Sequence, residues 1–150
     1  MLVSQILGQK GAMDVVTIAP DALVAEAARL LSEKRIGAVV VSEDARPLGI
    51  LSERDIVREL GRRGESSLKD SVSDLMTRNL ISCVPDDLAD SVLVKMTEGR
   101  FRHMPVMDGD RMVGLISIGD VVKARLSELS MEKSALEDMI KGYWAACFDL

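Results

Sequence analysis

Cysteine, histidine and aromatic residues are scarce in this chain of 150 residues, and each shortage excludes a class of protein. Two cysteines and one histidine are too few for a disulfide framework or for a structural zinc site. Aromatic residues make up 3% of the chain, which argues against the stacking platforms that bind single-stranded nucleic acid. The net charge of −5 leaves no basic surface on which nucleic acid would be the expected partner.

Long apolar runs are also missing. No stretch approaches the roughly 20 apolar residues that cross a bilayer, and residues 1–13 lack the pattern of a secretion signal. We therefore expect a cytoplasmic protein with no membrane partner. The remaining composition, 47% hydrophobic and 29% charged, is that of an ordinary globular protein. Within it we expect Cys83, in a strand-like apolar run, to be a small buried residue.

A tandem repeat organises the chain. A shift of 65 residues aligns residues 15–60 with 80–125 without a gap, and 11 of the 46 pairs are identical, where composition alone gives roughly 3. Upstream, residues 3–7 match 72–76 at a shift of 69, so the first copy carries four extra residues in its Gly8–Asp14 loop. We divide the chain into a first unit, a second unit and a C-terminal helix with an aromatic segment, at residues 1–64, 65–129 and 130–150.

Each unit predicts the element order β-α-β-β-α. In the first unit the strands are expected at 15–18, 37–41 and 48–51, with a helix at 22–34 capped by Asp21 and another from Ser52 to Gly61. The second unit predicts a strand at 80–84, a helix at 87–98, strands at 103–107 and 112–116, and a helix from Gly119. A unit of roughly 60 residues buries too little apolar surface to be stable alone. We therefore expect an α/β (α+β) fold in which two pseudo-symmetric units pack face to face, followed by a C-terminal helical tail.

The sequence Gly-x-x-Ser-x-x-Asp occurs once in each unit, at 49–55 and 114–120. Ser52 and Ser117 stand where a strand passes into a helix, and the free N–H groups and dipole of a helix start favour an anion. Asp55 and Asp120 follow one helical turn later, and a carboxylate can accept from both hydroxyls of a ribose. Glycine permits a close approach of backbone. The same spacing is also that of a plain capping box, so both interpretations stay open.

Three features, in their order and duplication, resemble the tandem CBS (cystathionine-β-synthase-type) domain pair, or Bateman module. They are the Pro-Asp starts at 17–21 and 82–86, the central strands at 36–41 and 101–106, and the two Gly-x-x-Ser-x-x-Asp motifs. The resemblance covers about residues 2–129. It implies a stand-alone regulatory module that binds adenosine ligands (AMP, ADP, ATP, NAD(H) or S-adenosylmethionine) between the units. It also implies a disc-like homodimer and a separate regulated partner protein.

The resemblance and the residue chemistry together select candidate nucleotide-binding residues. Arg102 and His103 stand where the first unit has Gly37 and Ala38, and cations suit phosphate groups. The unequal cations predict one cleft for a mononucleotide and one for a longer adenylate, with Val39, Met104 and Pro105 as apolar walls for the base. The full set is Lys10, Thr17, Gly37, Ala38, Val39, Ser52, Arg54, Asp55, Ser82, Arg102, His103, Met104, Pro105, Ser117, Gly119 and Asp120.

Catalysis is not expected. Ser52 and Ser117 have no basic partner close in sequence, and neither a phosphate-binding Walker loop nor a metal-ligand cluster is present. We predict no catalytic residue, no metal and no catalytic cofactor. The alternative to a nucleotide sensor is a ligand-free scaffold whose task is dimerisation.

The last helix of the second unit predicts a long extension. Residues 122, 126, 129, 133, 136 and 140 are spaced alternately four and three apart, which is the a/d seam of a coiled coil interrupted by Lys133. Three placements stay open for this seam: across a dimer, on a partner protein, or against the chain's own domain. Residues 142–150 hold the only Trp, the only Tyr, Cys147 and one of two Phe, Phe148, a concentration typical of a docking segment.

Overall fold

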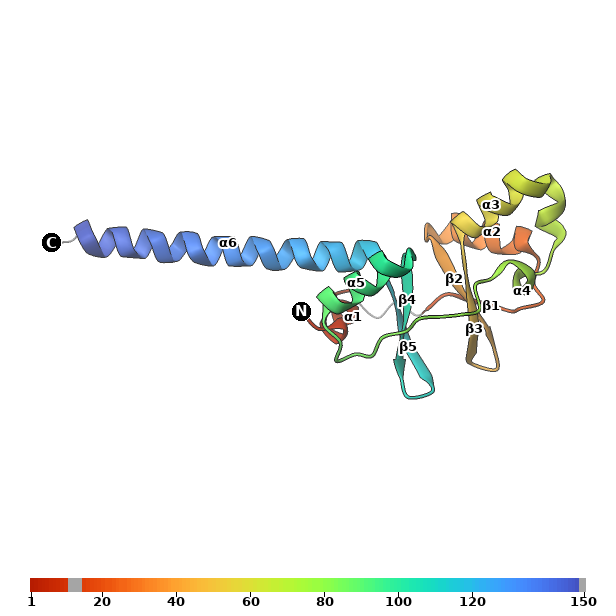
Figure 1. The fold of residues 1–150 in the computed structure, drawn as a ribbon, viewed down its shortest axis with the longest axis horizontal. Helices are drawn as coiled ribbons and strands as arrows, with labels where there is room; N and C mark the ends of the chain where they lie inside the picture. The colour runs from red at the N-terminus through yellow and green to blue at the C-terminus, as the bar shows by residue number, and fades with distance from the viewer. Residues whose placement is uncertain (11–14, 149–150) are drawn as a thin grey trace.

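Two α/β halves lie next to each other, and a long helix projects from one of them (Figure 1). The computed structural model describes residues 1–10 and 15–148, with side chains up to residue 144. Part of the predicted Gly8–Asp14 loop, including Gly11, therefore lies outside the described residues, as do the side chains of Cys147 and Phe148.

The first half is built around a three-stranded sheet in which β1 runs parallel to β2 and β2 runs antiparallel to β3. Two helices pack on this sheet, and a 3-10 helix packs against these helices. Its elements are β1 (Thr17–Ile18), α2 (Val24–Lys34), β2 (Ala38–Glu43), β3 (Arg46–Ser52), α3 (Glu53–Arg63) and η1 (Gly64–Lys69). The sequence predicted the order β-α-β-β-α but not the 3-10 helix η1. In addition, α3 continues past the expected stop at Gly61 and ends before Gly64, whose φ is +75°.

The second half repeats the architecture with a two-stranded antiparallel sheet. Its elements are α4 (Val72–Leu75), α5 (Ala89–Gly99), β4 (His103–Asp108), β5 (Arg111–Ser117) and α6 (Ile118–Phe148), and α1 (Val3–Gln9) packs here as well. The strand expected at 80–84 is wrong, because only Cys83 pairs, in a single bridge with Val106. In the first half the N–H of Val40 donates to Val16 O at 3.0 Å. The equivalent residue of the second half is Pro105, which has no N–H to donate, so this strand-pairing bond cannot form there.

The leading helix of each half packs on the other half. Val3 N–H of α1 donates to Asp87 O at 2.9 Å, and Val72 N–H of α4 donates to Ala22 O at 2.8 Å. These pairs are equivalent in the repeat. The glycine of each Gly-x-x-Ser-x-x-Asp motif makes room for the exchange. A Cβ on Gly49 would lie 2.7 Å from Thr77 O, and a Cβ on Gly114 would lie 2.8 Å from Leu7 Cδ2.

The exchanged segments also cap α2 and α5. The expected cap by Asp21 is wrong, because the N-cap residues are Leu23 and Leu88 and neither makes a side-chain cap hydrogen bond. Instead, Val24 N–H donates to Asp70 O and Ala89 N–H donates to Met1 O, both at 2.9 Å. A backbone carbonyl from the neighbouring segment thus satisfies a helix-start donor that a side chain usually satisfies.

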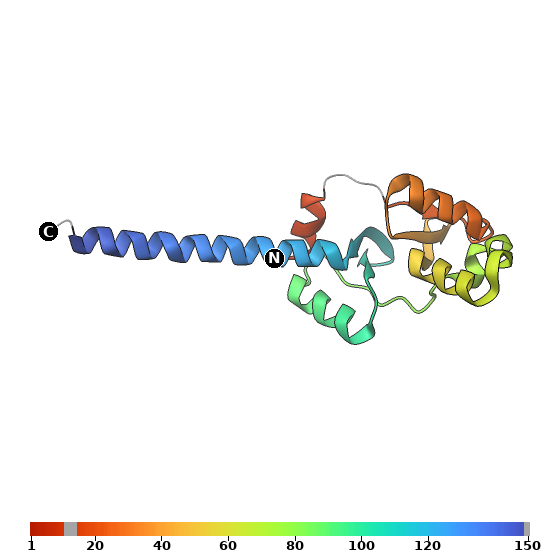
Figure 2. The same cartoon turned by 90° about the horizontal axis from the view of Figure 1, so that it is seen from above.

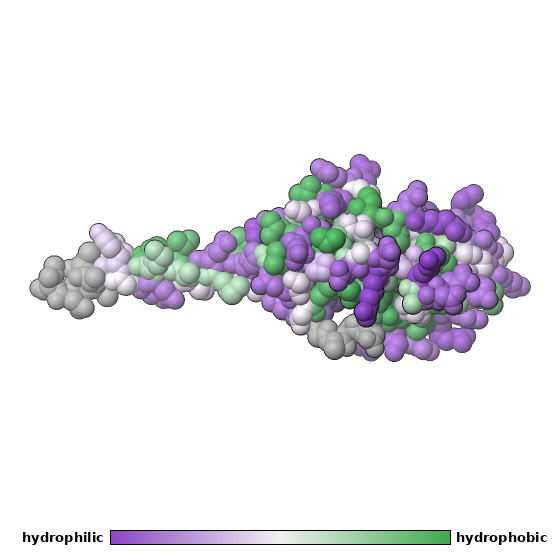
Figure 3. Space-filling model, turned by 90° about the horizontal axis from the view of Figure 1, so that it is seen from below, coloured by the Kyte–Doolittle hydropathy of each residue, from purple (hydrophilic) through white to green (hydrophobic). Residues whose placement is uncertain are grey.

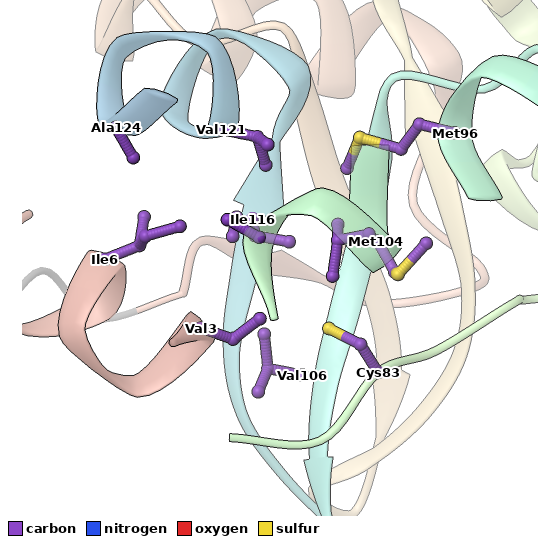
Figure 4. Close-up of a cluster of buried hydrophobic side chains, with 11 residues drawn as sticks. Val3, Ile6, Cys83, Met96, Met104, Val106, Ile116, Val121 and Ala124 are labelled. Carbon is purple, nitrogen blue, oxygen red and sulfur yellow. The ribbon is translucent and has the colours of Figure 1, made fainter. Parts of the chain in front are cut away.

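This exchange produces two hydrophobic cores, and each core contains residues from both halves of the chain. Val3 and Ile6 of α1 lie in the second core with Met104, Ile116 and other buried residues (Figure 4). Val72 and Met76 lie in the first core with α2, β2, β3 and α3. Cys83 is 2% exposed, which confirms the expected buried cysteine, and burial raises the pKa of its thiol to about 11.

The exchange predicts that α1 is required for the stability of the second half. Replacing Ile6, 2% exposed, by Ala should lower the free energy of unfolding by about 2–5 kcal/mol, because the core cannot refill the volume of the lost side chain. Chemical denaturation measures this. Ile81→Ala is the matched control, since Ile81 is 48% exposed, and its effect should stay within about 0.5 kcal/mol. Equal effects of the two substitutions would contradict the assigned role of α1.

Candidate functional site

Two clefts lie between the halves. Cleft 1, of about 590 Å³, combines Ser117 and Asp120 of the second half with residues 35–38 of the first. Cleft 2, of about 530 Å³, combines Ser52 and Asp55 of the first half with residues 99–103 of the second. The two clefts are equivalent under the repeat, and each needs both halves. Their volumes fall within the roughly 300–1,000 Å³ of small-molecule sites.

Each Gly-x-x-Ser-x-x-Asp motif forms a capping box at the start of its helix. In cleft 2, Ser52 N–H and Ser52 Oγ donate to Asp55 Oδ2 at 3.0 and 2.9 Å, and Asp55 N–H donates back to Ser52 Oγ at 3.3 Å. In cleft 1, Ser117 N–H donates to Asp120 Oδ2 at 2.9 Å, and Asp120 N–H donates to Ser117 Oγ at 3.1 Å. The capping interpretation is therefore confirmed for both copies. The same bonds hold both carboxylates at the cleft walls.

Lys10 makes the two carboxylates unequal. Its Nζ lies 2.7 Å from Asp120 Oδ2 and 3.1 Å from Leu115 O, at the end of the exchanged helix α1. Burial alone would raise the pKa of Asp120, but the hydrogen bonds from Lys10 and Ser117 outweigh it, so that pKa lies below its ordinary value. In cleft 2 the corresponding carboxylate has a looser cation, with Arg58 Nη1 at 3.7 Å from Asp55 Oδ1.

Arginines gather in cleft 2. Sequence assigned Arg54 to one unit and Arg102 to the other, but the structure brings both into this one cleft, together with Arg58 and Arg100. Four guanidinium groups there face two carboxylates, Glu53 and Asp55. Among the described residues that line cleft 1, the charged groups are Lys10, Arg35 and Asp120. The lining of cleft 2 therefore carries the larger formal positive charge of the two.

His103 lines both clefts. It opens β4 beside Gly37, and a Cβ on that glycine would lie 3.4 Å from His103 Cε1. Burial lowers the pKa of His103 below its ordinary value, and the positive charge of Lys10 lowers it further, while the carboxylate of Asp120 acts in the opposite direction. The neutral imidazole is thus favoured at the wall between the two clefts.

Sequence reasoning missed Arg35 and Arg100. Both residues end the first helix of their half with a left-handed backbone, φ 54° and 57°, and Arg35 lines cleft 1 as Arg100 lines cleft 2. Non-glycine residues seldom adopt this conformation, and such residues cluster at functional sites. The signal was present in the sequence, because these arginines are one of the identical pairs of the repeat.

Ten of the sixteen candidate residues line one or both clefts. Thr17 and Ser82 are exposed on the surface and line neither cleft, and Gly119 lines neither cleft.

The expected apolar walls are wrong, because Val39 and Met104 are 0% exposed and Pro105 is buried too. Met104 shares the core-facing side of β4 with Val106, since side chains two apart along a strand point the same way. Apolar lining comes instead from Leu7, Val15, Val16, Ile36, Val113 and Leu115 in cleft 1, and from Ile50, Leu80, Ile81, Phe101 and Ile118 in cleft 2.

Among residues 1–10 and 15–144, no group of three His, Cys, Asp or Glu side chains is placed to hold a metal ion. Within the described part of the chain, no helix combines the length and apolar character needed to cross a bilayer.

Comparison with known proteins identifies the class. The family model of the CBS domain matches residues 3–62 and again residues 72–127, so the chain belongs to the CBS-domain family and carries two such domains in tandem. CBS domain-containing protein CBSX3, mitochondrial, of Arabidopsis thaliana is 35% identical over 127 residues, which are 81% of this chain and 62% of that protein. The chain therefore spans less than two thirds of this relative.

Solved structures share the fold. A CBS-domain containing protein from Agrobacterium tumefaciens is similar with 48% identity and a TM-score of 0.80, over 83% of this chain and 99% of that one. A CBS domain protein of Pyrobaculum aerophilum, complexed with AMP, has 26% identity and a TM-score of 0.74 over 87% and 99% of the two chains. The CBS domain pair of protein MJ0100, in complex with 5′-methylthioadenosine and S-adenosylmethionine, has 25% identity and a TM-score of 0.75 over 85% and 98%.

The pKa of His103 tests the arrangement of cleft 1. Lys10→Met removes a positive charge near the imidazole, so the pKa of His103 should rise relative to the wild type. Because the chain has one histidine, its imidazole proton resonance can be titrated by NMR without assignment of other residues. Lys69→Met, which alters a lysine of η1, is the control and should leave the titration unchanged. An unaltered pKa in Lys10→Met would show that Lys10 does not occupy cleft 1 in solution.

Proposed function

We propose that this chain is a non-catalytic, cytoplasmic regulatory module that binds an adenosine ligand in each cleft and signals to a separate protein. One observation carries the proposal. In each cleft, an aspartate held by its capping serine in one half lies across from a segment of the other half that contains arginine. The ligands named in the titles of two structural neighbours, AMP for one and 5′-methylthioadenosine with S-adenosylmethionine for the other, support the same chemical class.

In cleft 2 each part of a nucleotide has a matching group. The Asp55 carboxylate is held by Ser52 and accepts hydrogen bonds from the ribose hydroxyls. The arginines neutralise phosphate charge, and a guanidinium can hold two phosphate oxygens at once. Ile50, Ile81 and Phe101 supply the apolar surface for the base. With four arginines, this cleft suits the longer adenylate, such as ATP or NAD(H).

In cleft 1 the ligand must displace an internal ion pair. Lys10 already occupies Asp120 Oδ2 at 2.7 Å, so ribose hydroxyls compete with an ammonium group for the carboxylate. A phosphate offers Lys10 a new partner, whereas an uncharged nucleoside leaves the displaced ammonium without one. This cleft therefore favours a phosphorylated ligand, and its smaller set of cations suits a mononucleotide such as AMP.

Signalling follows from the position of the clefts between the halves. A ligand that contacts both halves stabilises one relative orientation of them, and a partner protein that distinguishes orientations responds to the ligand concentration. A disc-like homodimer of paired units would present this difference on a larger surface. The alternative is a scaffold whose clefts stay empty, and ligand binding distinguishes the two functions.

Calorimetric titration tests the proposal. AMP, ADP, ATP, NADH and S-adenosylmethionine are titrated into nucleotide-free protein, with saturable binding expected at one or two sites per chain. Asp55→Asn should weaken binding in cleft 2 and Asp120→Asn binding in cleft 1, each by about ten- to a hundredfold, because each loses hydrogen bonds to a charged group worth roughly 1.5–3 kcal/mol.

The control is Asp110→Asn in the exposed turn between β4 and β5, which should bind like the wild type. Thermal melting checks that the capping substitutions leave the fold intact, since Asn retains an oxygen that can accept. No heat and no thermal shift with any of these compounds would reject nucleotide sensing in favour of the scaffold.

A further inference from the structure

The distal part of α6 makes no contribution to either core. Val121 and Ala124 are buried against the second half, and Arg125 and Glu128 are half-buried. Beyond Glu128 every described side chain is exposed, and the helix stands clear of the body in both ribbon views (Figures 1 and 2). Residues 129–148 extend about 30 Å at the rise of an α-helix.

A helix of this kind needs a partner. Most of the stability of a protein helix comes from packing of its apolar face, and packing against the body does not support this one. Large apolar side chains are nevertheless exposed along it, among them Leu129, Leu136, Ile140 and Tyr143 at 48–67%, and hydrophobic residues are visible on its surface (Figure 3). The prediction that the helix could lie against its own domain is therefore wrong for this part of the chain.

These side chains form a single line along the helix, the α6 seam. It consists of Val122, Leu126, Leu129, Lys133, Leu136, Ile140 and Tyr143. The spacing alternates between four and three, so the repeat is 3.5 residues. This is the period of two helices that supercoil around each other, with Leu126, Lys133 and Ile140 at position a and Val122, Leu129, Leu136 and Tyr143 at position d. Both Val122 and Leu126, nearest the body, are exposed, so the seam is accessible along its whole length.

The charges beside the seam fit a second copy of this chain in parallel. Lys133 at position a lies 4.0 Å from Glu137 of its own helix. In a parallel, in-register pair, Glu132 at position g of one copy lies opposite Glu137 at position e of the other, and Lys133 of each copy lies beside these carboxylates and offsets their repulsion. An antiparallel pair centred on the free stretch would place Glu137 opposite Glu137, with Lys133 displaced from Glu132 of the second copy. A polar residue at one a position is a known device for fixing register.

A lipid surface is the poorer occupant. Residues 129–148 contain three acidic residues, Glu132, Glu137 and Asp138, against two lysines, Lys133 and Lys141. Helices that lie on anionic membranes carry an excess of Lys and Arg on their polar face, and this segment does not.

We propose that the α6 seam joins two copies of this chain in a parallel, in-register, two-stranded coiled coil. The contact is separate from any homodimer formed through the paired units. Most of the seam lies beyond residue 127, where the match to the CBS domain ends. The Agrobacterium tumefaciens structure aligns over 99% of its length with 83% of this chain, so the remaining sixth of this chain has no counterpart there.

Cysteine cross-linking of the full chain tests the pairing. In a Cys147→Ser background, Leu136→Cys places a thiol at position d, where two in-register helices bring equivalent side chains together. Mild oxidation with glutathione disulfide should convert most of the protein to a disulfide-linked dimer on a non-reducing gel. Asp138→Cys is the matched control, because position f faces away from the partner helix, and it should stay monomeric on the same gel.

Several outcomes would overturn the proposal. Equal cross-linking of the two variants would indicate random collision, and absence of the Leu136→Cys dimer would exclude the parallel register. Flotation of the wild-type chain with phosphatidylglycerol vesicles, combined with absence of that dimer, would replace the second copy by a lipid surface. Because the test detects a bond between two seams, dimerisation through the paired units cannot imitate a positive result at Leu136 alone.

Discussion

The exchange of leading helices is the constraint on which the rest of this structure depends. Neither half closes its core alone, because α1 supplies Val3 and Ile6 to the second half and α4 supplies Val72 to the first. Each fully buried aliphatic side chain contributes roughly 1.5–3 kcal/mol relative to an exposed one, so separation of the halves would uncover both cores at once. The halves are therefore held against each other, and the two clefts between them are a consequence of how the cores are filled.

The exchange also makes the clefts unequal. Lys10, which directly follows helix α1, reaches Asp120, whereas the segment after α4 enters cleft 2 as Thr77 and Asn79 and brings no positive charge there. The Gly8–Asp14 loop, which carries the four extra residues of the first copy, thus contains the lysine that enters cleft 1. Cleft 2 receives its cations from elsewhere, from the helix α3 and from the turn before β4. His103 borders both clefts.

Local and repeated features could be predicted from the sequence, whereas features that depend on which segments meet could not. The order of helices and strands in a unit, the capping motifs and the extended last helix follow from residue spacing within short stretches. The duplication follows from comparing the chain with itself. The exchange of α1 and α4 involves residues about 85 and 50 positions apart, such as Val3 with Asp87 and Val72 with Ala22, and no local pattern reports it. For the same reason the sequence separated Arg54 from Arg102, which the fold places in one cleft. Arg35 and Arg100 stood out in the sequence as an identical pair of the repeat. That they line the clefts became evident only from the fold.

The central claim is that adenosine ligands enter the clefts between the halves, and the imidazole of His103 reports on it most directly. AMP and then ATP are titrated into nucleotide-free protein while the His103 ring resonance is followed by NMR. Because His103 lines both clefts, occupation of either one should shift this resonance, with saturation at the stoichiometry found by calorimetry. A resonance that stays in place while calorimetry records saturable binding would contradict the account, because the ligand would then lie outside both clefts.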